Sequence, residues 1–129
     1  MSKILIAEDD LQIASLIVLA FSRRGHEVFH APDGARTLEL AVEQPLDLIL
    51  LDVMMPVMTG LEVLDRLQDD AALKRIPVVI LSARSRDADI RAGLAAGAVD
   101  YVTKPFSLRE LVARAEANLA PSAVPLPPS

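Results

Sequence analysis

The chain has 129 residues, which is enough for one domain with one sizeable hydrophobic core. Hydrophobic residues make up 52% of the sequence, so disorder throughout the chain is excluded. Lys+Arg 13 against Asp+Glu 18 leave a net charge of −5, and such an acidic domain is not expected to bind nucleic acid directly because it repels phosphate backbones.

The sequence also excludes several kinds of site and segment. It has no cysteine, which rules out disulfides and thiolate metal sites and is compatible with a reducing compartment. The N-terminal residues MSKILIAEDD do not have the pattern of a signal peptide. The longest apolar run, 13–21, is far shorter than the ~18 residues that a membrane span needs. We therefore expect a cytoplasmic protein without membrane contact.

Two periodicities alternate along the chain. Short runs rich in Ile, Leu and Val predict strands at 3–7, 27–31, 47–51, 76–81 and 98–102. Longer segments with apolar residues at helical spacing predict helices at 13–21, 34–43, 60–68, 87–96 and 108–119. Asp10 and Asp33 are placed to cap the first two helices, and Gly25 and Gly97 to end the first and the fourth.

This alternation predicts the fold class. Strands that alternate with helices form right-handed βαβ crossovers, so we expect a doubly wound α/β domain with a five-stranded parallel sheet and helices on both faces. The last residues, PSAVPLPPS at 121–129, carry no charge and no periodicity, and we interpret them as a linker or a frayed end. The domain is therefore expected to cover 1–120.

Polar residues follow four of the expected strands. They are Glu8, Asp9 and Asp10 after the first, Asp52 after the third, Ser82 after the fourth, and Thr103 and Lys104 after the fifth. In a parallel sheet these ends meet at one edge, where functional groups gather. Carboxylates that meet there repel one another, and a Mg²⁺ ion with oxygen ligands relieves that repulsion. A lysine and a hydroxyl beside the metal suit phosphoryl transfer, with an aspartate as the nucleophile.

Each of these residues also has an ordinary structural interpretation. A single Asp after a strand is commonly a turn residue or a helix cap, and a cap is our interpretation of Asp10. Ser82 could begin a loop, and Lys104 could be a surface lysine. The joint placement at the ends of four strands is what favours a functional site.

Four segments in this order and spacing make the sequence recognisable: ILIAEDD, DLILLDVMMPVMTG, VVILSAR and GAVDYVTKPF. They resemble the response-regulator receiver domains of two-component signalling, over roughly residues 2–119. The resemblance implies the CheY-like, flavodoxin-like fold with strand order 2-1-3-4-5. The later segment KPFSLRELVARAEANL resembles receivers that are fused to winged-helix DNA-binding domains.

The resemblance implies a role for each residue at the expected sheet edge. Asp52 matches the phosphoacceptor, Lys104 the lysine that contacts the phosphoryl group, Ser82 the switch hydroxyl and Tyr101 the aromatic residue that changes rotamer on activation. A cis peptide bond is expected between Lys104 and Pro105, as is usual in the family.

The resemblance also implies a metal site. Glu8 and Asp9 match the acidic pair that holds Mg²⁺, and Asp52 and the backbone carbonyl of Met54 match the remaining protein ligands. The side chains of Met54 and Arg84 flank the path of the hydrolytic water in the family. Because neither can orient a water as an acid or amide would, we expect slow intrinsic dephosphorylation.

The function that the resemblance implies is a phosphoryl-accepting signalling switch. Asp52 would receive its phosphoryl group from a sensor histidine kinase or a phosphotransfer protein. The face formed by the expected helix 87–96, strand 98–102 and helix 108–119 would then change its contacts with a downstream protein or output domain. No turnover of an external substrate is expected beyond the domain's own phosphorylation and dephosphorylation. The alternative is a receiver-like interaction module that is never phosphorylated.

Two enzyme-like alternatives fit the sequence less well. Aspartate-nucleophile phosphatases carry Asp-x-Asp after a strand, whereas Met54 stands two residues after Asp52. A nucleotide-binding flavodoxin-like protein needs a Gly-rich phosphate loop, and none follows the first expected strand. Met55 and Met58 are interpreted as core residues without a site role.

The expected output face departs from the winged-helix subfamily at two positions. Asp100, Glu110 and Arg114 match charged residues through which those receivers form phosphorylation-dependent homodimers. Ile90 and Val99 replace residues that are often basic and acidic there, and they would instead form an apolar patch for another partner. Whether residues 121–129 lead to an output domain or end a stand-alone regulator stays open.

Overall fold

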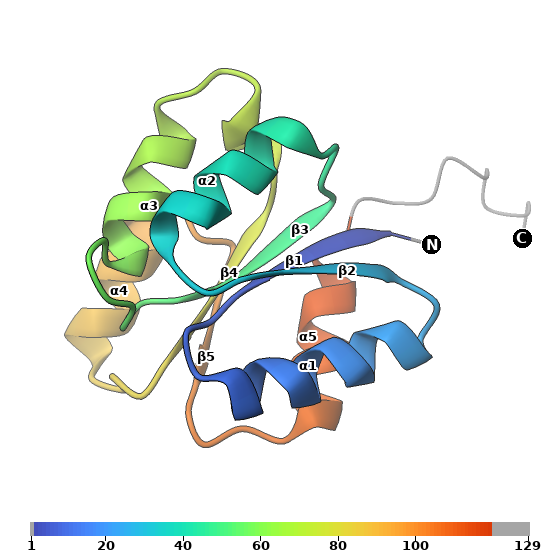
Figure 1. Cartoon of the computed structure of the whole chain (residues 1–129). Coiled ribbons are helices and arrows are strands. Elements are labelled where there is room, and N and C mark those ends of the chain that lie inside the picture. The colour runs from blue at the N-terminus through green and yellow to red at the C-terminus, as the bar shows by residue number, and fades with distance from the viewer. Residues whose placement is uncertain (1, 120–129) are drawn as a thin grey trace, which may run out of the picture.

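The computed structural model describes residues 2–119 (Figure 1). The elements are β1 (Lys3–Ala7), α1 (Leu11–Arg23), β2 (Glu27–Ala31), α2 (Gly34–Glu43), β3 (Leu48–Asp52), α3 (Gly60–Gln68), η1 (Leu73–Arg75), β4 (Val78–Ser82), α4 (Asp87–Ala95), β5 (Asp100–Thr103) and α5 (Leu108–Ala117). The proline-rich segment 121–129 lies outside the described residues.

The predicted fold class is confirmed. All neighbouring strands pair in parallel, in the order β2-β1-β3-β4-β5. Helices α1 and α5 cover one face of the sheet, and α2 and α3 cover the other (Figure 1). Residues of β1, β3 and β4 are almost entirely buried because both faces of these strands are covered.

Three strands are shifted relative to the sequence prediction. β3, β4 and β5 begin at Leu48, Val78 and Asp100, one to two residues later than expected, and each ends one residue later. The delay of β4 has a physical reason, since Pro77 has no N–H to contribute to the ladder. Asp52 and Ser82 are therefore the last residues of their strands, and the ladder sets their backbones.

The predicted helix caps are confirmed. The Asp10 side chain accepts hydrogen bonds from the N–H groups of Gln12 and Ile13, and Asp33 accepts one from Arg36. Gly25 and Gly97 follow their helices with φ of 88° and 118°, a left-handed conformation that ends a helix.

The two methionines expected in the core do pack there. Met55 is buried in the cluster between the sheet and α2 and α3, and Met58 packs against the same cluster. Ile90 also packs against it, whereas Leu94 and Val99 are exposed. The predicted apolar patch of Ile90 and Val99 is thus reduced to Val99.

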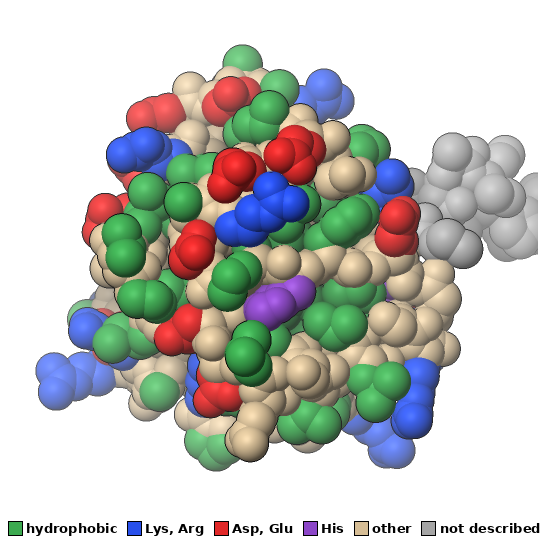
Figure 2. All heavy atoms as spheres, in the orientation of Figure 1, with side chains coloured by type: hydrophobic (Ala, Val, Ile, Leu, Met, Phe, Trp, Pro, Cys, Tyr) green, Lys and Arg blue, Asp and Glu red, His purple; other side chains and the backbone are tan. Residues whose placement is uncertain are grey.

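Helix α1 exposes an unusual amount of apolar surface. Leu11, Leu16 and Leu19 are about half or more exposed. Figure 2 shows hydrophobic side chains and a histidine on the side of the molecule that β2 and α1 present to the viewer. Within residues 2–119, no helix is long and apolar enough to cross a membrane.

Val57, in the loop between β3 and α3, has an unfavourable backbone conformation. Its φ is 68°, which β-branched residues rarely adopt, and its side chain is fully exposed. We expect Val57→Gly to raise the free energy of unfolding by about 1 kcal/mol, because strain is removed and no buried contact is lost. Urea unfolding of the two proteins measures this, with Val42→Gly, an exposed helical site, expected to be destabilising instead. A lower stability of Val57→Gly contradicts the expectation.

Candidate functional site

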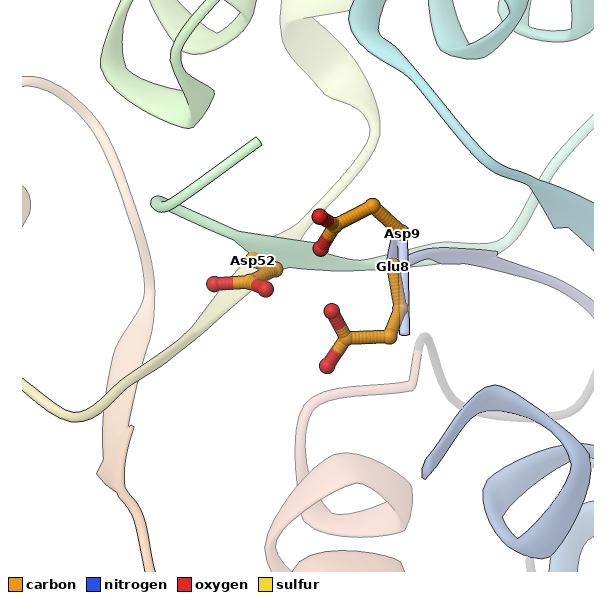
Figure 3. Close-up of side chains that lie close together, drawn as sticks. All are labelled: Glu8, Asp9 and Asp52. Carbon is orange, nitrogen blue, oxygen red and sulfur yellow. The ribbon is translucent and has the colours of Figure 1, made fainter. Parts of the chain in front are cut away.

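Three carboxylates meet at the carboxyl end of the sheet. Glu8 and Asp9 follow β1, Asp52 ends the neighbouring β3, and one oxygen of each lies within 4.8 Å of the others (Figure 3). Glu8 and Asp52 are buried, whereas Asp9 is exposed to solvent. Asp10, the fourth acid of this region, caps α1.

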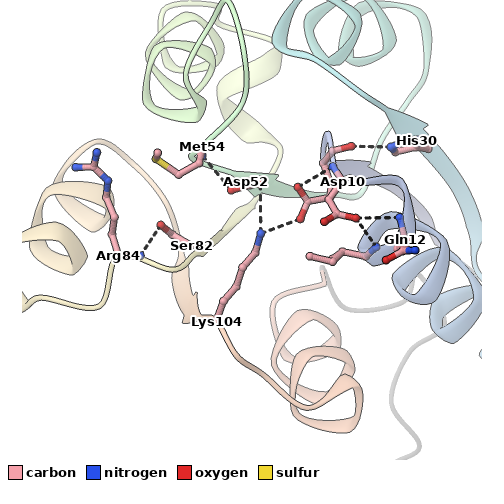
Figure 4. Close-up of polar contacts among 10 residues, drawn as sticks. Asp10, Gln12, His30, Asp52, Met54, Ser82, Arg84 and Lys104 are labelled. Carbon is pink, nitrogen blue, oxygen red and sulfur yellow. Dashed lines mark hydrogen bonds and ion pairs between the residues drawn. The ribbon is translucent and has the colours of Figure 1, made fainter.

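Lys104 supplies a positive charge to this cluster. It follows β5, and its Nζ lies 2.9 Å from Oε1 of Glu8 and 3.3 Å from Oδ2 of Asp52 (Figure 4). The backbone N–H of Lys104 donates to the carbonyl of Ser82 at 2.8 Å, and the peptide bond to Pro105 is cis. The ammonium therefore bridges acids that lie 44 residues apart along the chain, Glu8 and Asp52.

The charges of these groups depend on one another. Burial raises the pKa of Glu8 to about 8, and the hydrogen bond and negative charge of Asp52 act in the same direction, against Lys104. Burial disfavours the ammonium of Lys104, but its contacts with Glu8 and Asp52 outweigh this and raise the pKa of Lys104. Without a further cation, burial and the neighbouring Asp52 therefore favour the protonated form of Glu8 more than water does.

The loop after β3 holds Asp52 in place. Its Oδ1 accepts a hydrogen bond of 3.0 Å from the N–H of Met54. Gly60, the first residue of α3, packs so closely on the strand end that a Cβ there would collide with the Asp52 carbonyl oxygen and lie 2.7 Å from Cα of Val53. Thr59 and Glu62 form a capping box at the same helix start.

Ser82 and Tyr101 share a neighbour, the backbone of Arg84. The Ser82 hydroxyl accepts a hydrogen bond of 3.0 Å from the N–H of Arg84, and the Tyr101 hydroxyl donates one of 2.8 Å to the Arg84 carbonyl. Both side chains are buried. The ring of Tyr101 fits against α4 because residue 93 is glycine, where a Cβ would lie 2.9 Å from Cδ2 of the ring.

The structure thus places the predicted site residues in two groups, with Met54 beside Asp52. Glu8, Asp9, Asp52 and Lys104 converge, and Ser82 and Tyr101 are linked through the backbone of Arg84. Met54 is 54% exposed, and its backbone N–H donates to Oδ1 of Asp52.

Sequence reasoning missed two contacts. One is the ion pair between Lys104 and Glu8, which is shorter than the pair between Lys104 and Asp52. The other is His30, whose Nε2 lies 2.8 Å from the backbone carbonyl oxygen of Glu8. A single histidine in an edge strand carries no sequence signal for such a contact.

The donor set fits a hard divalent cation. The three clustered side chains offer only carboxylate oxygens, two of them next to each other in sequence, and no His or Cys joins them within the described residues. Oxygen donors at a partly exposed site, with room for water beside Asp9, suit Mg²⁺ better than Zn²⁺ or Cu²⁺.

An apolar groove lies next to the cluster. It runs between α1 and the segment after β5 and is lined by Ile13, Leu16, Ile17, Ala83, Lys104, Pro105, Phe106 and Leu108. Lys104 lines this groove and also contacts the carboxylates of Glu8 and Asp52.

Solved structures of receiver domains share the fold of this chain. The chain is similar to the receiver domain of a Francisella response regulator, with a TM-score of 0.87, 36% identity and 92% of this chain and 96% of that chain covered. It is also similar to the chemotaxis protein CheY4 of Vibrio cholerae, with a TM-score of 0.87, 30% identity and 92% and 99% coverage.

Comparison with curated sequences extends the likeness to longer proteins. The transcriptional regulatory protein YrkP of Bacillus subtilis is 44% identical over 117 residues, and response regulator GtcR of Aneurinibacillus migulanus is 40% identical over 120 residues. These matches cover 91% and 92% of this chain but 49% and 48% of those proteins, so the chain spans about half the length of its curated relatives. The sequence profile of the response regulator receiver domain matches residues 4–116. The chain therefore belongs to the response-regulator receiver domain family.

Proposed function

We propose that this receiver domain is a phosphoryl-accepting switch with Asp52 as the acceptor. The observation that carries the proposal is the position of Asp52: buried at a strand end, 3.3 Å from the Lys104 ammonium and next to two further acids. A carboxylate oxygen of Asp52 attacks the phosphorus of a phosphohistidine and the P–N bond breaks. The histidine nitrogen keeps the electron pair of that bond, and the ring leaves as neutral imidazole with one proton taken from solvent. The product is an acyl phosphate on Asp52.

The other residues of the cluster position the phosphoryl group and offset its negative charge. Glu8, Asp9, Asp52 and the Met54 carbonyl would hold Mg²⁺, which when bound offsets the charge of the phosphoryl oxygens. Lys104 reaches the same region from β5 and donates to the oxygen that faces it. Burial of Glu8 and Asp52 keeps water away and strengthens these interactions.

The proposed readout begins at Ser82 and Tyr101. In the structure the Ser82 hydroxyl accepts a hydrogen bond from the N–H of Arg84. A phosphoryl oxygen on Asp52 would accept a hydrogen bond from the same hydroxyl and draw Ser82 toward Asp52. Tyr101 is bound to the carbonyl of Arg84, so a shift of Arg84 changes the support of the tyrosine ring between β5 and α4. We propose that this changes the α4–β5–α5 face for a downstream protein or output domain.

Intact mass tests the proposal. The protein is incubated with acetyl phosphate and Mg²⁺, and one phosphoryl adduct is expected on the wild type and none on Asp52→Asn. Asp65→Asn, at an exposed position of α3, is the matched control and should form the adduct. No adduct on the wild type, from acetyl phosphate or from histidine kinases, would favour the unphosphorylated interaction module.

We further propose that the phosphodonor is a sensor histidine kinase or phosphotransfer protein of the cytoplasm and that it binds at α1. Leu11 and Leu16 are 66% and 55% exposed, and the apolar groove beside α1 contains Lys104. Relatives named as transcriptional regulators suggest a transcriptional output.

Leu16→Arg separates docking from chemistry. We expect the rate of phosphotransfer from a partner kinase to fall at least tenfold. The reason is that an arginine in the docked complex would lose its water, which costs about 1.4 kcal/mol or more of binding free energy. The rate with acetyl phosphate should stay at the wild-type value, since Leu16 does not touch the carboxylates. Equal losses with both donors would show that the substitution damages the site itself.

Met54→Asn tests the expected slow dephosphorylation. The Met54 side chain is exposed beside Asp52 and cannot orient a water. An amide at this position should accelerate the decay of phospho-Asp52 by about 10-fold or more. Decay is followed by loss of the adduct from intact protein, and an unchanged or slower decay in the variant counts against the expectation.

Homodimer formation through the charged residues of β5 and α5 has less support. Arg114 donates to both carboxylate oxygens of Asp100, at 2.8 and 3.0 Å, and lies 3.4 Å from Glu110. These charges are thus already paired within one chain, so a dimer would have to exchange existing ion pairs for new ones. Each exposed pair contributes only about 0–1 kcal/mol, which leaves little to drive such an exchange.

A further inference from the structure

Residues of strand β2 form hydrogen bonds with both the backbone N–H and the backbone carbonyl of Glu8. The Glu8 N–H donates to the carbonyl of Ala31 at 3.1 Å, which continues the ladder past the end of β1. On the other side, Nε2 of His30 lies 2.8 Å from the Glu8 carbonyl oxygen (Figure 4). Because a carbonyl oxygen only accepts, Nε2 must carry the hydrogen and donate it.

The peptide that receives this hydrogen bond joins two residues of the carboxylate cluster. The carbonyl of Glu8 belongs to the peptide unit between Glu8 and Asp9, so its orientation sets the direction in which both side chains leave the backbone. Glu8 is fixed further by burial and by Lys104. Asp9 is exposed and follows the end of the β1 ladder, so the His30 contact is a main constraint on the peptide before it.

The environment of His30 keeps the ring in this orientation. Side chains alternate along β2, so Phe29 faces the α2 side of the sheet while Val28 and His30 face α1. His30 lines a groove with residues of α1: Leu11, Ala14, Ser15, Val18, Leu19 and Ser22. Within residues 2–119, the ring makes its hydrogen bond to the Glu8 carbonyl and not to a side chain of this mostly apolar wall.

We propose that His30 is a positioning residue for the Glu8–Asp9 metal-binding pair and strengthens the affinity of the site for Mg²⁺. The inference rests on the proposed function, because it assumes that these carboxylates hold the metal. His30 itself touches no metal ligand atom and contributes through the hydrogen bond to the Glu8–Asp9 peptide. Residues that orient ligands in this way typically change metal affinity by about 10- to 100-fold when replaced.

Metal binding by three variants tests this role. Mn²⁺ binding is followed at pH 8 by the EPR signal of the free ion, and Mg²⁺ by competition. His30→Phe keeps an aromatic ring in the apolar groove but has no donor, whereas the Nε2 amide of His30→Gln can donate to the same carbonyl. His26→Phe is the matched control, since His26 contacts Glu116 at 2.8 Å and not the carboxylate cluster.

We expect His30→Phe to weaken binding of both metals about tenfold, and His30→Gln to restore most of the affinity. His26→Phe should bind like the wild type even if it is less stable, which separates affinity from general destabilisation. Wild-type affinity in His30→Phe, or no restoration in His30→Gln, would overturn the positioning role alone. A wild-type protein that binds neither metal would overturn the metal site of the proposed function, and the role of His30 with it.

Discussion

Raising the pH from about 5 to about 8 lowers the free energy of unfolding of the metal-free protein. The cause is Glu8, whose pKa lies at about 8 in the folded chain against 4.5 as its ordinary value. Between these values the folded state binds more protons than the unfolded state, so stability is highest below the lower pKa and falls as pH rises through the upper one. The free energy of unfolding is expected to fall by on the order of a few kcal/mol over this pH range.

Glu8→Gln should remove this pH dependence. The amide keeps an oxygen for Lys104, which lies 2.9 Å from Oε1 of Glu8, but it cannot ionise beside Asp52. Above pH 8 the variant is therefore expected to be more stable than the metal-free wild type. Adding Mg²⁺ should restore the stability that the wild type loses at high pH, and it should change the stability of the variant less. Glu39→Gln, on the exposed side of α2, is the control and should keep the wild-type slope.

Urea unfolding at several pH values, with and without Mg²⁺, measures these differences. The account of Glu8 is wrong if the stability of the metal-free wild type is flat or rises over this range. It is equally wrong if Glu8→Gln loses stability as the wild type does.

Lys104→Met should slow phosphorylation by acetyl phosphate by about 10²- to 10³-fold, the usual loss for one donor to a developing charge. The Lys104 ammonium lies 3.3 Å from the attacking carboxylate and is held at 2.9 Å by Glu8, so it is in place before the reaction begins. Methionine keeps a chain of similar length without a charge. The rate of adduct formation by intact mass measures the effect.

Measuring the Mg²⁺ affinity of Lys104→Met shows whether phosphorylation slows because the ammonium is missing or because the variant no longer binds Mg²⁺. The ammonium competes with a metal for the same carboxylates, so Lys104→Met should bind Mg²⁺ at least as tightly as the wild type. Lys74→Met, an exposed lysine in η1, should behave as the wild type in both measurements. Wild-type phosphorylation by Lys104→Met would remove Lys104 from the proposed chemistry.

The placement of the main site residues followed from sequence for a simple physical reason. Parallel strands bring their carboxyl ends to one edge, so residues after apolar runs must meet there even when they are far apart in the chain. Asp52 and Lys104 were placed in this way, and the register of β3 and β4 only moved Asp52 from just after its strand to the strand's last position.

Other features could not be predicted from the sequence, because side-chain contacts across strands leave no local pattern. The hydrogen bond from His30 to Glu8 depends on the register of β1 and β2 and on the face to which His30 points. The shared contacts of Ser82 and Tyr101 run through the backbone of Arg84, which has no sequence signature. The left-handed conformation of Val57 contradicts the preference of its residue type, so local propensity does not indicate it.

The most direct test of the central claim is the chemical identity of residue 52 after phosphorylation. Borohydride reduces an acyl phosphate to an alcohol, so the wild type treated with acetyl phosphate and Mg²⁺ and then with borohydride should contain homoserine at position 52. Peptide mass spectrometry reads this change, and Asp52→Asn should show no reduced residue. Reduction at another acid such as Asp9 or Glu8, or at none in a protein that carries the phosphoryl adduct, would contradict Asp52 as the acceptor.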